Sequence, residues 1–192
     1  MNKTMSARGG SASGGKKIII IILIVIGALG LGVVLFLQDQ KASKLAVRDV
    51  SSNMPQVGEE IPILGREHSK DINVKAEYNS NPPTSGTHFE YAEKWGVFDQ
   101  PQPDVKMIHN LEHGGIWISY KDDGIDEQTK ASLEAITKAN SGSVIMTPRP
   151  QNDSKIALAS WGRLEKLENY DEAKILEFIK ANKNKSPETL AR

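Results

Sequence analysis

The sequence predicts an α+β fold: a single N-terminal transmembrane helix followed by one small domain with a largely antiparallel sheet and helices on one face. Three observations predict the domain. Residues 116–120 are β-branched and aromatic, apolar residues recur at helical spacing from Asp126 to about Asn140, and Asp171 precedes a second amphipathic stretch. The order strand, helix, strand, strand, helix is typical of helices that cover one side of an antiparallel sheet.

The first strand and the first helix are separated by a turn. The strand Ile116–Tyr120 ends at the sequence Lys121-Asp122-Asp123-Gly124, which is rich in turn-forming residues. In the helix that follows, apolar side chains recur every three or four residues and form one face.

Two further strands and a last helix are expected. Residues 143–147 form a short strand that stops before Pro148, and residues 155–161 pair back on it as a hairpin across a turn at 151–153. Asp171 is an N-cap residue for the last helix, whose buried face includes Ile175.

The N-terminal part divides into three segments before the domain. Residues 1–17 are basic and rich in glycine and serine, which is typical of a disordered tail. Residues 18–37 are apolar without a charge or a proline, and about 20 such residues cross a hydrocarbon core of about 30 Å. Residues 38–54 are a polar linker, and residues 55–192 have the length of one domain.

The charges around the apolar segment predict its orientation. Four basic residues and no acidic residue precede it, so we expect the N-terminus in the cytoplasm and the domain outside, on a single-pass cell-membrane protein. A cleaved signal peptide is the alternative. An anchor is favoured because the apolar run is longer than a usual signal core and no small-residue cleavage site follows it.

Composition excludes several functions. The part after the apolar segment has 20 basic and 24 acidic residues, a net charge of −4 that argues against nucleic-acid binding. The chain has no cysteine, which excludes disulfides, thiolate zinc sites, iron–sulfur clusters, blue copper and cysteine nucleophiles. No phosphate loop or dinucleotide motif is present, so no nucleotide or organic cofactor is indicated.

All four histidines lie between His68 and His113, which makes this region the candidate for chemistry. Imidazole is the commonest metal ligand. His109 and His113 are four residues apart and precede Gly114-Gly115, a helix-stop signal. On a short helix their Cβ atoms lie about 5–6 Å apart, close enough to reach one ion.

His88 follows the stiff loop Asn81-Pro82-Pro83-Thr84-Ser85-Gly86-Thr87, which predicts a rigidly held side chain. It is either a ligand or a histidine that bonds a neighbouring carbonyl. His68 is interpreted as a surface residue or a further ligand. Glu112 is a further ligand, an acceptor that orients an imidazole, or an exposed residue; direct ligation is the least expected, because Glu112 is adjacent to His113.

His109-Asn110-Leu111-Glu112-His113 also fits the His-x-x-Glu-His pattern of inverted zinc proteases. That pattern has only three fixed positions, and Gly114-Gly115 ends the long helix those enzymes need. A protease is therefore not favoured.

The motifs together resemble a known family. The loop that ends at His88, the run from His109 to Gly115, and the later segments 147–150 and 159–162 are similar to a bacterial membrane-anchored family of domains of unknown function. The resemblance covers about residues 55–165. It implies the grouping of the histidines and brings no established activity, substrate or metal.

The sequence therefore predicts a membrane-anchored, extracytoplasmic domain that binds a copper or zinc ion through His88, His109 and His113, with His68 or Glu112 next in line. Two alternatives stay open. One is a non-enzymatic interaction module of the cell envelope, with an unidentified protein partner and structural histidines. The other is a zinc-dependent hydrolase, for which no general base is evident.

Overall fold

The computed structural model describes residues 54–192, which form one compact unit. The expected tail at 1–17, the apolar segment at 18–37 and nearly all of the linker lie outside the described residues. Within residues 54–192, no helix is long and apolar enough to cross a membrane.

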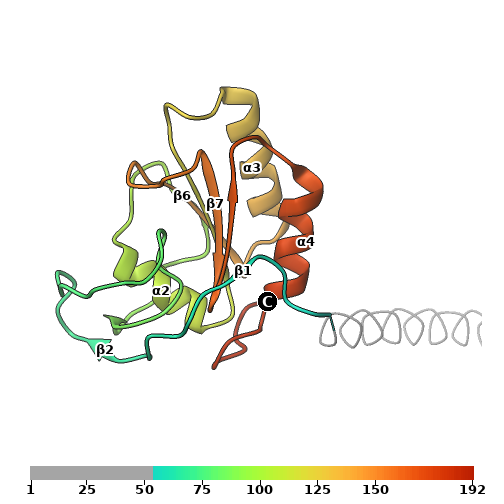
Figure 1. The fold of residues 1–192 in the computed structure, drawn as a ribbon. Helices are drawn as coiled ribbons and strands as arrows, with labels where there is room; N and C mark the ends of the chain where they lie inside the picture. Colours follow the sequence, from blue (N-terminus) through green and yellow to red (C-terminus); the bar gives the residue numbers. More distant parts are fainter. Residues whose placement is uncertain (1–53) are drawn as a thin grey trace, which may run out of the picture. The chain divides into compact units, whose positions relative to one another are not determined.

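The unit is an α+β domain, as predicted, built on a mixed sheet (Figure 1). The sheet order is β1-β8-β7-β5-β6-β4. The pairs β1–β8, β8–β7 and β7–β5 are antiparallel, whereas β5–β6 and β6–β4 are parallel. The strands are β1 (Glu59–Glu60), β4 (Gly96–Val97), β5 (Ile116–Tyr120), β6 (Val144–Pro148), β7 (Ile156–Ser160) and β8 (Arg163–Leu167).

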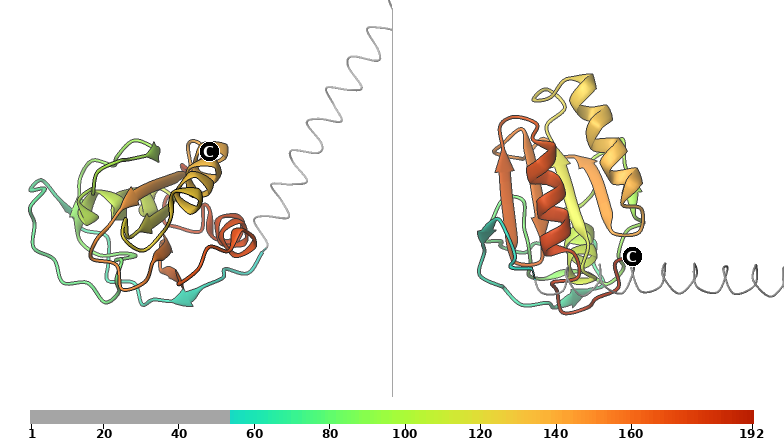
Figure 2. Two further views of the ribbon diagram at one scale, coloured as in Figure 1. Left: turned by 90° about the horizontal axis from the view of Figure 1, so that it is seen from above. Right: turned by 90° about the vertical axis from the view of Figure 1, so that its right-hand side faces the viewer.

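Two helices cover one face of the sheet, as expected. They are α3 (Glu127–Ala139) and α4 (Glu172–Asn182), and the right-hand view of Figure 2 shows them side by side in front of the strands. The predicted cap at Asp171 is confirmed: its carboxylate accepts from the N–H of Lys174 at 3.1 Å. Asp126 caps α3 in the same way, accepting from the N–H of Thr129 at 2.7 Å.

A third helix, α2 (Asp104–Glu112), lies on the opposite face, so the expectation of helices on one face only is wrong (Figure 1). Met107, Ile108 and Leu111 of α2 pack against Trp117 of β5 in one core cluster. The neighbouring residues of β5, Ile116 and Ile118, belong to the other cluster, with α3 and α4. Because successive side chains of a strand point to opposite faces, β5 is buried on both sides.

The predicted hairpin between 143–147 and 155–161 is also wrong. Strand β7 pairs with β5 and β8, and β5 lies between β6 and β7. Helix α3 connects β5 to β6, which lies parallel to β5 on the side away from β7. Strands β6 and β7 are therefore close in sequence but are not neighbours in the sheet. Strand β8, which the sequence did not predict, forms the hairpin with β7 instead.

Two very short strands stand apart from the main sheet and carry histidines. They are β2 (His68–Ser69) and β3 (His88–Phe89), which pair in parallel with His68 opposite His88. Strand β3 also contacts α2. This places three histidine-bearing segments together on the α2 side of the sheet.

Candidate metal site

The loop before His88 is fastened to the segment before His68. The N–H of Gly86 donates to the carbonyl of Gly65 at 3.1 Å, and the N–H of His88 donates to that of Glu67 at 2.9 Å. The Tyr78 hydroxyl donates to the Thr87 carbonyl at 2.8 Å, and burial raises the pKa of Tyr78 to about 12, so the donor proton is retained across the physiological range. These bonds hold His88 in one position.

Helix α2 brings the other candidate residues. Pro103 is its N-cap residue, and the helix ends at Glu112. Gly114 then takes a positive φ of 85°, and the N–H groups of Gly114 and Gly115 donate to the carbonyls of Leu111 and Asn110. This is the helix stop that the two glycines predict.

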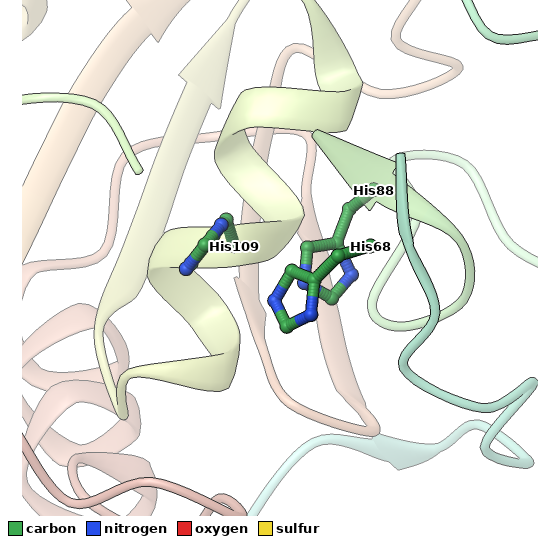
Figure 3. Close-up of side chains that lie close together, drawn as sticks. All are labelled: His68, His88 and His109. Atoms are coloured by element: carbon green, nitrogen blue, oxygen red, sulfur yellow. The ribbon is translucent and has the colours of Figure 1, made fainter. Parts of the chain in front are cut away.

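Three histidines lie close enough to hold one metal ion. His68, His88 and His109 each offer a ring nitrogen, and these nitrogens lie within 4.8 Å of one another. Figure 3 shows His109 on α2 beside the rings of His68 and His88. His88 is fully buried, while the side chain of His68 is 44% exposed. The site therefore has a buried wall and a solvent-facing side.

Hydrogen bonds to the backbone orient two of the rings. Nδ1 of His88 donates to the Gly86 carbonyl at 2.8 Å, and Nδ1 of His109 donates to the Phe89 carbonyl at 2.7 Å. A neutral imidazole has one N–H, so Nε2 of each ring carries the lone pair. An imidazole held by its other nitrogen in this way is typical of metal ligands.

Glu112 lies between two of the imidazoles. Its Oε2 is 3.1 Å from Nε2 of His88 and 3.2 Å from Nε2 of His68, and the side chain is only 1% exposed. A carboxylate oxygen and an unprotonated nitrogen both carry lone pairs, so they repel unless a proton or a metal ion lies between them. Among the residues that the structure describes, the second oxygen, Oε1, is buried without a hydrogen-bond partner, and the Arg66 guanidinium lies 4.0 Å from it.

His113 lies at the rim and not in the group of three. Its Nε2 is 3.1 Å from Nε2 of His109 and 3.1 Å from Oε2 of Glu188. Sequence reasoning did not single out Arg66 or Glu188: an isolated charged residue in an irregular segment carries no signal of its own.

The ring of His109 is biased toward its neutral form. Burial lowers its pKa below the ordinary histidine value, and the neighbouring rings of His113, His88 and His68 lower it further, against the bond that it donates to the Phe89 carbonyl, which raises it. A histidine must be neutral to bind a metal ion, so this shift keeps His109 available as a ligand.

The comparison with protein families confirms the predicted resemblance to a family of domains of unknown function. A family model described as "Protein of unknown function (DUF3105)" matches residues 69–192. The chain belongs to the DUF3105 family. The DUF3105 match includes His88, His109, Glu112 and Glu188 and begins one residue after His68. No curated protein and no solved structure matches the chain.

Proposed function

We propose that this domain binds a copper or zinc ion through His68, His88 and His109, with Glu112 as a fourth ligand or as the acceptor that orients His68 and His88. The observation that carries the proposal is the group of three ring nitrogens within 4.8 Å of one another. Nitrogen ligands with a carboxylate suit both zinc and copper.

The facing lone pairs are the second support. Nε2 of His88 and Oε2 of Glu112 are both buried and 3.1 Å apart, and the Gly86 carbonyl already takes the ring's other nitrogen. A metal ion bound to both atoms removes the repulsion. Two ligands held about 2.0–2.2 Å from one zinc ion in tetrahedral geometry are about 3.3–3.6 Å apart, slightly more than the observed separation.

The test is the metal content of the full-length chain, purified without a polyhistidine tag, beside His88→Gln and His109→Gln. We expect near-stoichiometric zinc or copper in the parent and loss in both variants. Met107→Leu on the same helix is the matched control, because Met107 lies in the apolar core and the substitution conserves volume.

A structural role for the histidines is the second candidate, since both ring nitrogens of His88 have protein partners within hydrogen-bond distance. In that case added metal leaves the melting temperature unchanged. A bound ion raises it, because a ligand that binds only the native state stabilises that state.

We also propose that the domain lies outside the cytoplasm, held by residues 18–37. The support is the uncharged apolar run and the four basic residues before it. The full chain should stay in the membrane pellet after alkaline extraction, and protease added to intact spheroplasts should digest the domain. Recovery of the protein in the soluble fraction contradicts the anchor.

A further inference from the structure

His113 has one N–H and two acceptors within reach. Its Nε2 is 3.1 Å from Nε2 of His109 on one side and 3.1 Å from Oε2 of Glu188 on the other. A single N–H makes one well-aligned hydrogen bond at a time. The ring therefore donates to one partner at the expense of the other.

One of these two acceptors is also the atom that a metal ion needs. Nδ1 of His109 donates to the Phe89 carbonyl, so Nε2 holds the only free lone pair of the ring. That lone pair accepts the His113 N–H or binds a metal ion in the group with His68 and His88, and it cannot do both. Metal binding and the His109–His113 hydrogen bond are thus mutually exclusive.

We propose that His113 is a positioning residue, which metal binding at His109 turns toward Glu188, and that this couples the metal site to the C-terminal segment 183–192. The inference rests on the proposed metal binding and adds to it a route by which occupancy of the site reaches another part of the domain. It also removes His113 from the set of metal ligands.

The C-terminal segment can respond to a change at His113, because its backbone is hydrogen-bonded to the end of α2. The N–H of Glu188 donates to the Glu112 carbonyl at 3.1 Å, and the N–H groups of Leu190 and Ala191 donate to the His113 carbonyl at 3.0 Å. The side-chain bond from His113 to Glu188 joins the same two pieces. When His113 donates to Glu188, the segment gains a charge-assisted bond and opens less often.

The coupling is small and reciprocal. The side chains of His113 and Glu188 are 23% and 40% exposed, so water weakens the bond between them. We expect the two equilibria, zinc binding and opening of the segment, to change each other by a factor of about three. Thermodynamic linkage requires this factor to be the same in both directions. Metal should slow opening of the segment about threefold, and loss of the Glu188 carboxylate should weaken metal binding about threefold.

The experiment uses the full-length chain in detergent, with zinc as the probe. Zinc affinity is measured by competition with a chelator, and amide hydrogen exchange of residues 183–192 is measured with and without zinc. The variants are Glu188→Ala, Glu188→Gln, which keeps an acceptor oxygen, and His113→Ala. Glu177→Ala, an exposed carboxylate on α4, is the matched control.

Zinc should protect the segment in the parent and in Glu177→Ala, not in Glu188→Ala or His113→Ala, and to an intermediate degree in Glu188→Gln. If Glu188 has only a structural role, Glu188→Ala changes the amide exchange of residues 183–192 by the same factor with and without zinc. His113→Ala should bind zinc at least as tightly as the parent, because it removes a competitor for His109.

Two results overturn the inference. If His113→Ala loses zinc as His109→Gln does, His113 is a ligand. If zinc protects the segment equally in Glu188→Ala, the route does not pass through Glu188. The zinc titration of the parent tests the metal site on its own. If the parent binds no zinc, the proposed metal site is wrong, and the coupling is wrong with it.

Discussion

At the scale of single residues, the carboxylate of Glu112 connects His68 with His88. Glu112→Gln keeps the shape and removes the negative charge that balances a bound cation. We expect zinc affinity to fall about 10–100-fold, the usual cost of losing a group that orders metal ligands. Competition with a chelator measures it. Glu93→Gln, which breaks the ion pair with Lys106 on α2, is the control. Unchanged affinity in Glu112→Gln contradicts the role given to this carboxylate.

The lowered pKa of His109 predicts how stability changes with pH in the metal-free chain. Below about pH 6.5, the ordinary histidine pKa, the unfolded chain takes up a proton at this position more readily than the folded chain does. The free energy of unfolding therefore falls as pH falls through this range. His109→Gln, which cannot titrate, should lose less stability between pH 7 and pH 5. Thermal melting at several pH values measures the difference, and equal slopes would rule out this contribution.

Part of the site follows from local sequence. His109 lies on α2 and His113, four residues later, is the C-cap residue of that helix, and their ring nitrogens do approach to 3.1 Å. Helical spacing also places Glu112, three residues after His109, on that side of the helix. The adjacency of Glu112 to His113 makes direct ligation the least expected role, whereas its spacing from His109 agrees with its place beside the rings of His68 and His88. The approach of His68 depends on the parallel pairing of β2 with β3, which no local pattern shows.

At the scale of elements, the junction between α2 and β5 leaves no room for a side chain. A Cβ on Gly115 would overlap the ring of Trp95. Gly115→Ala should therefore lower the free energy of unfolding by about 1–3 kcal/mol, as overpacking of a core does. Gly124→Ala is the control, because the nearest atom to a Cβ there, Cβ of Lys121, is 3.1 Å away, so the neighbours need to shift only slightly. Urea unfolding of both variants tests this, and equal stability would show that Trp95 moves freely.

The elements that the sequence predicts are those with a pattern long enough to read. Helices α3 and α4 have capping aspartates and one apolar face, and both were predicted. Strands β5, β6 and β7 are buried on both faces, so their side chains do not alternate and give no sign of which strands pair. The wrong prediction of a hairpin between 143–147 and 155–161 has this cause. Strands of two residues, such as β2 and β3, have no periodicity at all.

At the scale of the whole domain, Arg149 joins three segments that are distant in sequence. Its Nε and one terminal nitrogen donate to the carboxylate of Asp104, at the start of α2. The other terminal nitrogen donates to the side-chain oxygens of Asn81, in the loop before His88, and Asn152. The guanidinium also lies over the ring of Trp117, with the two centres 5.7 Å apart. Both the loop that carries His88 and the helix that carries His109 are thus tied to one side chain.

Arg149→Lys should disturb this arrangement, because a single ammonium group cannot reproduce the fork of donors that a guanidinium offers. We expect the free energy of unfolding to fall by about 2 kcal/mol, the scale of hydrogen bonds to charged groups. Arg163→Lys is the matched control: its partner Glu60 is exposed, so the loss there should stay below about 1 kcal/mol. Urea unfolding gives both values.

Because Asn81 and Asp104 lie in the segments that present His88 and His109, zinc affinity should also fall in Arg149→Lys and not in Arg163→Lys. A destabilised Arg149→Lys chain with unchanged zinc affinity would mean that local bonds, such as those that the rings donate to the Gly86 and Phe89 carbonyls, are sufficient to position the ligands.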